Sequence, residues 1–355
     1  MNAPQPVGEL DRRKYLGGSD AAAVFGVSPW RTPLDLFLDK VKPPSEPEYR
    51  DPARERFFRR RKQQEPFIAA MLREECGMEV VRLSLDEAPN RYIDPEHEFL
   101  AAEIDFEFLM TDSVRTAFPE RPEFAAIQDG TLLNGEIKTV HPFAAAEWGE
   151  QGSEEVPIHY AAQVMHGLGV TRRPAAIVAA LFGLDNLLCF PVMSDPETIE
   201  AMRKSCVLFW RQHVEARVPP APVNLDDIKR LYSRFAGRPA HLDDDRTALL
   251  QRLDQLRANR KQVGEQIDEA EFQLAEFIAR QWGTPIVNED GKLQLPETKD
   301  NALLMAGDRV IGTWSSQRGT YLDQRRLKAE KPDVIDQYTK EHHYRTFRLK
   351  KGKST

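Results

Sequence analysis

Cysteine is scarce in this chain, and long apolar runs are missing from it. The three cysteines, Cys76, Cys189 and Cys206, are widely separated, whereas zinc and iron–sulfur sites usually draw their ligands from closely spaced pairs. We therefore expect core or incidental thiols. No run approaches the roughly 18 to 20 apolar residues of a membrane span, and the N-terminal MNAPQPVGELDRRKY lacks the apolar centre of a signal peptide. These absences predict a cytoplasmic protein without a membrane segment.

Positive charge is not in excess either. The 355 residues carry a formal net charge of −7, with 49 Lys and Arg against 56 Asp and Glu. Net charge describes solubility and average field, whereas nucleic-acid binding depends on where the basic groups lie. The 41% hydrophobic content is that of an ordinary soluble globular protein, and this length permits two or three domains.

The basic groups do gather in one segment, RDPARERFFRRRKQQE. Before Glu65, this segment holds seven cations and only two acids, Asp51 and Glu55. The cations are Arg50, Arg54, Arg56, Arg59, Arg60, Arg61 and Lys62. Such a cluster predicts sequence-independent contact with a duplex backbone. A solvated helix face is the alternative interpretation. A second basic patch closes the chain at Arg345, Arg348, Lys350, Lys351 and Lys353.

The segment TLLNGEIKTV carries the most informative chemistry. In a strand, Glu136 and Lys138 point to the same face, while Ile137 points into the core and leaves its carbonyl at the strand edge. With Asp105 in AAEIDFEF and Glu65 in QQEPFIAAML, the chain supplies three carboxylates and a lysine. Hard divalent cations prefer such oxygen ligands. The set indicates metal-dependent phosphodiester hydrolysis, although a Glu-x-Lys pair alone occurs often on solvated strands.

Glu65 and Asp105 each need a further argument before they are assigned to the site. Glu65 lies on the apolar stripe of a helix predicted over 54–76, where a carboxylate needs a hydrogen-bond partner, a cation or a cleft. Asp129 is close to Glu136 along the chain and is therefore a rival ligand to Asp105. We prefer Asp105 because it alternates with apolar neighbours in a strand, whereas Asp129-Gly130 is a ready turn dipeptide.

The remaining patterns predict an alternation of helices and strands. Ser19 or Asp20 is expected to cap a first helix that ends near Gly26, and Thr32 to cap a second. Strands are expected at VVRLSL, FLAAEIDFEFL, FAAIQDG, TLLNGEIKTV, AAIVAALFG and NLLCFPV, with a hairpin turn at Asp129-Gly130. Helices are expected over PIHYAAQVMHGLGV, opened by Pro157 and closed by Gly169, and over EAMRKSCVLFWRQHVEAR.

The proline-rich VPPAPVN predicts the end of the first domain. We assign 1–222 to that domain, 223–242 to a linker, 243–282 to a helical arm and 283–355 to a small α+β unit. The arm repeats apolar residues at alternating four- and three-residue spacing, interrupted where Arg260 takes an apolar position. It either packs on its own chain or forms an intermolecular coiled coil. The last unit is predicted to hold strand DRVIGTWSSQ, a helix broken at Pro332, and strand YRTFRLKK.

Several of these segments occur together in a recognisable order. With GGSDAAAVFGVSPWRTPLDLFLDK, QQEPFIAAMLREECG, the IDF strand, GEIKTV, VPIHYAAQVMHGLGVT and FWRQHV following one another, residues 9 to 218 resemble the YqaJ-type viral recombinase family, relatives of phage lambda exonuclease. The resemblance implies a PD-(D/E)xK nuclease fold of the α/β (α+β) class, in which a mixed sheet is flanked by helices. GTWSSQ and RTFRLKK are similar to the tail of some prophage members.

The resemblance also assigns roles residue by residue. It implies that Asp105, Glu136, the Ile137 carbonyl and Glu65 bind Mg²⁺ or Mn²⁺, and that Lys138 positions or activates the attacking water. Gln163, with Tyr160, matches the helix beside the site, and Arg12 with Ser19 match the residues that hold a terminal DNA phosphate. Phe106 departs from the family, in which glycine is common at that position, and 109–129 is longer than a tight hairpin needs.

The expected function is therefore a metal-dependent exonuclease that degrades linear double-stranded DNA, 5′-to-3′, together with a single-strand annealing recombinase. Relatives form trimers, so a homo-oligomer is also implied. The alternatives are an endonuclease, a Cas4-like end-trimming nuclease, which the scattered cysteines disfavour in its iron–sulfur form, and a DNA-binding scaffold without catalysis. The intact carboxylates and Lys138 disfavour the scaffold.

Overall fold

The strand β6 (Ala175–Phe182) is buried along its whole length. Its sequence AAIVAALF is the near-continuous apolar run of a strand covered on both faces. It belongs to a five-stranded sheet in the order β1-β4-β5-β6-β7, with β1 (Val80–Leu83), β4 (Phe106–Leu109), β5 (Leu132–Val140) and β7 (Asn186–Met193). Strands β5 and β6 run parallel, and the other neighbours are antiparallel. The computed structural model describes residues 7, 10–43, 52–84, 90–233, 240–281, 286–291, 293–294, 302–314 and 320–339.

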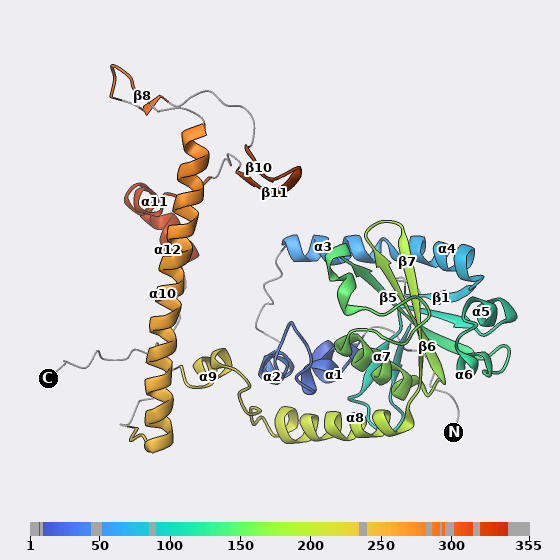
Figure 1. Cartoon of the computed structure of the whole chain (residues 1–355). Coiled ribbons are helices and arrows are strands. Elements are labelled where there is room, and N and C mark those ends of the chain that lie inside the picture. Colours follow the sequence, from blue (N-terminus) through green and yellow to red (C-terminus); the bar gives the residue numbers. More distant parts are fainter. Residues whose placement is uncertain are drawn as a thin grey trace. The chain divides into compact units, whose positions relative to one another are not determined.

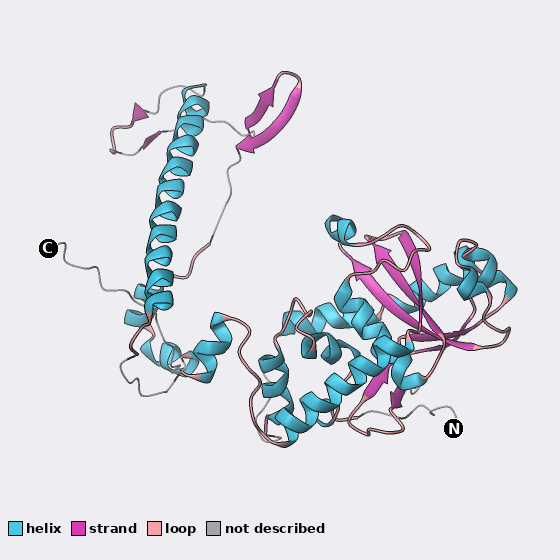
Figure 2. Cartoon of the chain, turned by 60° about the horizontal axis from the view of Figure 1, so that its bottom comes forward, coloured by secondary structure: helices cyan, strands magenta, loops and turns pink. Residues whose placement is uncertain are grey.

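Helices cover both faces of this sheet (Figures 1 and 2). On one face, α4 (Glu65–Cys76), α5 (Asp112–Ala117) and α6 (Pro122–Ala125) bury apolar side chains in one cluster with β4, β5 and β6. On the other, α7 (Ile158–Thr171) packs Val164 and Leu168 against Val178 and Ala180 of β6. The alternate residues of β6 therefore serve two cores, and the predicted mixed sheet flanked by helices is confirmed.

A second helical layer packs against α7. It consists of α1 (Gly18–Val24), α2 (Pro33–Val41), α8 (Pro196–Phe209) and its continuation as a π-helix, η3 (Trp210–Glu215), around a shared apolar cluster. The short helices η1 (Arg12–Lys14) and η2 (Pro142–Glu147) and the two-stranded pair β2 (Arg91–Ile93) and β3 (Ala101–Glu103) complete this part of the chain. This layer fixes the N-terminal residues beside α7.

Several helix boundaries differ from the sequence prediction. The N-cap of α1 is Gly17, because the Asp20 carboxylate accepts a hydrogen bond from the Gly17 N–H (3.0 Å). The single helix expected over 54–76 is two, α3 (Pro52–Lys62) and α4, since Pro66 offers no N–H to the preceding turn and its ring would clash with it. Helix α7 runs past Gly169 to Thr171. The predicted Thr32 cap of α2 is confirmed.

Two strand predictions also need correction. The segment FAAIQDG forms no strand: Pro122 starts α6, and Asp129-Gly130 is a turn after it rather than a two-residue hairpin. FLAAEIDFEFL is divided between β3, which pairs with β2, and β4, which pairs with β5. The chain changes sheets at Asp105, between these two strands. This break determines where the Asp105 carboxylate lies.

The chain divides into two compact units, Met1–Leu231 and Tyr232–Thr355. The first includes α9 (Leu225–Leu231), which lies within the predicted linker. Its Asp227 accepts a hydrogen bond from the Thr32 hydroxyl (3.0 Å), so the ordered contacts of this unit extend beyond VPPAPVN.

The second unit is described by itself. Its elements are α10 (Asp244–Gln281), β8 (Ile286–Val287), β9 (Leu293–Gln294), β10 (Ala302–Ala306), β11 (Arg309–Trp314), α11 (Gln324–Glu330) and α12 (Pro332–Tyr338). The helix break at Pro332 matches the prediction. The closing strand YRTFRLKK and the second basic patch lie outside the described residues. Within the described residues, no helix combines the length and apolarity needed to cross a membrane.

Candidate active site

The strand β5 continues beyond the end of its neighbour β4. Their pairing stops at Phe106 opposite Gly135, whereas β5 stays paired with β6 as far as Val140. On the side that β4 leaves open, the Ile137 N–H donates to the Asp105 carboxylate (2.8 Å). Because the N–H and C=O of one strand residue point to the same side, the Ile137 carbonyl lies on this edge too. The break before β4 therefore brings a carboxylate to the free edge of β5.

The basic helix α3 reaches the same edge. The Arg61 guanidinium donates to the Thr139 carbonyl (2.7 Å) and lies over the Phe57 ring (4.3 Å to its centroid). Arg59, Arg60 and Lys62 are exposed on this helix. The cationic segment predicted to contact DNA thus ends beside the residues of GEIKTV.

Three polar side chains form a network on the α7 side of β5. The Lys138 ammonium donates to Glu136 and to the Gln163 amide oxygen (3.2 Å), and the Gln163 amide N–H donates to Glu136 (2.5 Å). Alternation along the strand places Glu136 and Lys138 on one face, and α7 supplies Gln163. The Lys138 nitrogen also lies 4.8 Å from the centre of the Tyr160 ring. Gln163 therefore contacts both the Glu136 carboxylate and the Lys138 ammonium.

The charges of Asp105, Glu136 and Lys138 shift the pKa values within this group. Burial and then the negative charge of Glu136 raise the pKa of Asp105 to about 8. Burial by itself would lower the pKa of Lys138, but the charges of Glu136 and Asp105 raise it above its ordinary value. Two carboxylates in a site of low dielectric repel one another, and a cation between them would relieve that repulsion. The ammonium of Lys138 relieves part of it.

The donors at this edge suit a small hard cation. Mg²⁺ is usually held by one or two carboxylates and keeps several waters. Asp105, Glu136 and the Ile137 carbonyl provide oxygen donors of that kind. Over the described residues, no three His, Cys, Asp or Glu side chains are grouped closely enough to hold a metal alone. Glu65, at the start of α4, thus does not complete a three-carboxylate group, and its metal role stays a prediction.

The rival ligand Asp129 lies elsewhere. Gly130 N–H donates to the Met110 carbonyl (2.9 Å), which places the Asp129 turn beyond Leu109, at the opposite end of β4 from Asp105. The Asp129 carboxylate is exposed and pairs with Arg115 (3.5 Å). The structure therefore brings Asp105, and not Asp129, to Glu136.

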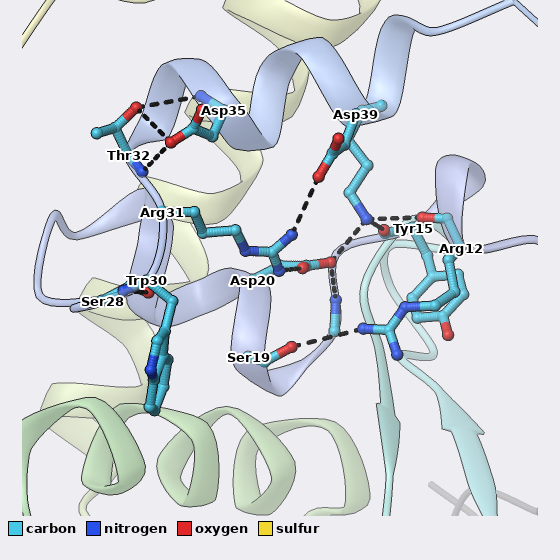
Figure 3. A network of polar contacts seen from close by, with 12 residues as sticks. Arg12, Tyr15, Ser19, Asp20, Ser28, Trp30, Arg31, Thr32, Asp35 and Asp39 are labelled. Carbon is cyan, nitrogen blue, oxygen red and sulfur yellow. Dashed lines mark hydrogen bonds and ion pairs between the residues drawn. The ribbon is translucent and has the colours of Figure 1, made fainter. Parts of the chain in front are cut away.

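Arg12 and Ser19 meet beside this site. An Arg12 guanidinium nitrogen lies 3.5 Å from the Ser19 hydroxyl (Figure 3). The neighbouring Gly18 packs closely on α7, since an added Cβ would approach the Gln163 side chain to 2.8 Å. A cavity of about 20 Å³, enough for one water molecule, is lined by Gly18, Glu136 and Gln163 among others. The glycine thus joins the Arg12–Ser19 pair to the carboxylate network.

A buried ionic network of Asp20, Lys40 and Arg31 contacts the backbone of Arg12. Asp20 accepts from Arg31 (Figure 3) and from Lys40 (2.6 Å). Lys40 also donates to the backbone carbonyls of Arg12 (2.6 Å) and Tyr15 (2.5 Å). Burial opposes ionisation of Asp20, but the charges of Lys40 and Arg31 still lower its pKa. Lys40 is not among the residues that the sequence patterns predicted for the site. The signal was its position three residues after Phe37, on the apolar side of α2.

Comparison with known proteins finds one family to which the first part of the chain is similar. Residues 9–174 match the family described as a YqaJ-like viral recombinase domain. The matched segment is similar to that family, as its motifs predicted.

Two kinds of relative extend the comparison. The uncharacterized protein YqaJ of Bacillus subtilis is 27% identical over 349 residues, which cover 96% of this chain and 92% of that protein. Among solved structures, LHK-Exo in complex with dAMP is 16% identical, covering 63% of this chain and 96% of its own, with a TM-score of 0.40. The alkaline exonuclease LHK-Exo from Laribacter hongkongensis gives the same identity and coverage with a TM-score of 0.39.

Proposed function

We propose that this protein is a divalent-metal-dependent deoxyribonuclease that degrades linear double-stranded DNA from its ends in phage-type recombination. The observation that carries the proposal is the open edge of β5, where Asp105 meets Ile137 while Glu136, Lys138 and Gln163 are joined on the adjacent face. The match to a viral recombinase domain supports the setting. Resection of DNA ends supplies single strands, so a single-strand annealing recombinase is the natural partner.

Each side chain has a task in this proposal. Asp105, Glu136 and the Ile137 carbonyl would hold Mg²⁺ or Mn²⁺, which supplies Lewis acidity and a polarised water. Lys138, kept protonated by its two carboxylate neighbours, stabilises negative charge that develops on the phosphorus centre. Gln163 fixes Lys138 against Glu136. Hydrolysis then depends mainly on positioning.

The flanking cations bind the DNA itself. Arg59, Arg60 and Arg61 on α3 contact backbone phosphates without reading sequence. Arg12 and Ser19, held beside Gly18, take the terminal 5′-phosphate, because a forked guanidinium and a hydroxyl together match its oxygens. That contact would set 5′-to-3′ polarity.

The decisive experiment compares a linear duplex with a covalently closed circle of the same sequence. With Mg²⁺ or Mn²⁺, wild-type protein should release mononucleotides from the linear duplex and leave the circle intact, and a 5′ label should be released first. Glu136→Gln is the matched inactive control. Cleavage of the circle would support an endonuclease instead. Binding of both substrates without hydrolysis would support a scaffold.

A further inference from the structure

The long helix α10 (Asp244–Gln281) exposes an apolar stripe. Its 38 residues span about 57 Å at 1.5 Å per residue. Six members of the stripe keep between 52% and 65% of their surface exposed: Leu249, Leu256, Val263, Ile267, Leu274 and Phe277. Within the described residues of α10, Ile278 alone is buried. Such a stripe is normally covered by another molecule or segment.

The spacing of the stripe specifies what covers it. Together with Leu253, Arg260 and Ala270, the six residues follow one another at alternating intervals of four and three residues. This seven-residue period keeps one seam facing a second helix that runs alongside, as in a coiled coil. The stripe therefore fits a helix of similar length rather than a sheet or a loop.

Two irregular positions identify the second helix. Arg260 is the one charged residue of the stripe and Ala270 its smallest. We propose that α10 pairs with α10 of a second copy of this chain, antiparallel, so that Arg260 packs across from the partner's Ala270. The short alanine leaves room for the arginine stem, whose guanidinium can extend to water. The same alignment puts Leu256 opposite the partner's Leu274 and Val263 opposite the partner's Ile267.

A parallel pair would fit poorly. It would stack Arg260 on the partner's Arg260, with two like charges in the seam, and Ala270 on the partner's Ala270, with a gap between them. In the antiparallel register, Arg260 lies opposite the partner's Ala270, so the like charges do not meet and no gap is left. The same register brings Leu253 against the partner's Phe277. The proposal concerns the second unit and does not depend on the nuclease chemistry.

Cysteine cross-linking tests the orientation in the full-length protein. Leu256→Cys and Leu274→Cys variants, carrying different affinity tags, are oxidised alone and after co-expression; the native cysteines in the described fold are buried. Antiparallel pairing predicts a disulfide-linked dimer in the co-expressed pair and none in either variant alone. A cross-link within Leu256→Cys alone would overturn the antiparallel arrangement.

Mass measurements test the seam itself. Light scattering of the full chain should give a mass that is a multiple of 40.6 kDa, at least twice that of one chain. Ile267→Asp should reduce this mass at least twofold at equal protein concentration. Phe272→Asp is the matched control, because Phe272 is equally exposed on α10 but lies outside the stripe. Equal masses for the Ile267→Asp and Phe272→Asp proteins, or a wild-type monomer at every concentration tested, would overturn the proposal.

Discussion

The Lys40 ammonium lies 2.6 Å from the Asp20 carboxylate, and the two side chains keep only 4% and 1% of their surface exposed. Lys40 also holds the carbonyls of Arg12 and Tyr15, so the pair fixes the N-terminal segment against α1. Removing Lys40 leaves the buried Asp20 carboxylate with Arg31 as its remaining counter-ion, and breaking such a buried pair costs about 3–5 kcal/mol.

We expect Lys40→Met to lower the free energy of unfolding of the first unit by about that amount, measured by denaturant titration. The double variant Asp20→Asn/Lys40→Met should lose less than the sum of the two single losses, since it buries neither the carboxylate nor the ammonium of this pair. Because Lys40 and Arg31 lower the pKa of Asp20 below its ordinary 3.8, the contribution of Asp20 is present above that pH and lost as pH falls below it. Purely additive losses would contradict a coupled pair.

Metal binding should depend on pH through Asp105. Burial and Glu136 raise its pKa to about 8 in the metal-free protein, so below pH 8 a cation must displace a proton. The affinity for Mn²⁺ should rise by about tenfold per pH unit between pH 6 and pH 8 and level off above. Calorimetry in two buffers of different ionisation enthalpy would count the released proton. Asp129→Asn should behave like wild type, whereas equal affinity at pH 6 and pH 8 would contradict the assignment of Asp105.

Lys138 is expected to act on the chemical step rather than on DNA binding. Lys138→Ala should reduce single-turnover cleavage by about 100-fold or more and leave duplex affinity within a few-fold of wild type. Lys62→Ala, which removes an exposed cation of α3, is the comparison: affinity should fall and its salt dependence weaken. If Lys138→Ala lost binding with an unchanged single-turnover rate, Lys138 would be a phosphate anchor.

The Arg12–Ser19 pair should read the DNA end. Wild-type protein is expected to degrade a 5′-phosphorylated duplex faster than a 5′-hydroxyl duplex, and Arg12→Ala should reduce that ratio by about tenfold, the worth of one charged hydrogen bond. Arg13→Ala is the neighbouring control, because Arg13 pairs with Asp11 and not with Ser19. A preference retained by Arg12→Ala would remove this residue from the end-binding site.

The first unit should function without the second, provided that it keeps α9. A protein ending at Leu231 is expected to bind metal and cleave DNA. One ending at residue 222 loses the Asp227–Thr32 bond and the Arg230–Asp35 ion pair, which together contribute about 1–2 kcal/mol. Thermal unfolding of the two truncated proteins would measure the difference. A Leu231-terminated protein that folds and binds metal but cannot cleave would mean that the second unit completes the active site.

The sequence predicted the parts of this molecule that depend on local pattern. The strand periodicity of GEIKTV and the Thr32 cap appear as expected because neighbouring residues determine them. Pro66 also indicated that the segment 54–76 forms two helices. The apolar stripe that continues across Pro66 led to the wrong prediction of a single helix. Lys40 and α9 were missed because their partners, Asp20 and Thr32, lie 20 and 195 residues away in sequence. The proximity of Asp105 to Ile137 likewise depends on which strand ends first, and spacing does not encode that.

The overhang of β5 beyond β4 has a consequence for solubility as well. A strand edge with free N–H and C=O groups is a template on which another chain can add a strand, and proteins commonly block such edges with charges. Here the Ile137 N–H is occupied by Asp105 and the Thr139 carbonyl by Arg61. One acid and one base therefore take the place of the missing strand, and the residues that we assign to metal and DNA also keep this edge from pairing with a neighbour.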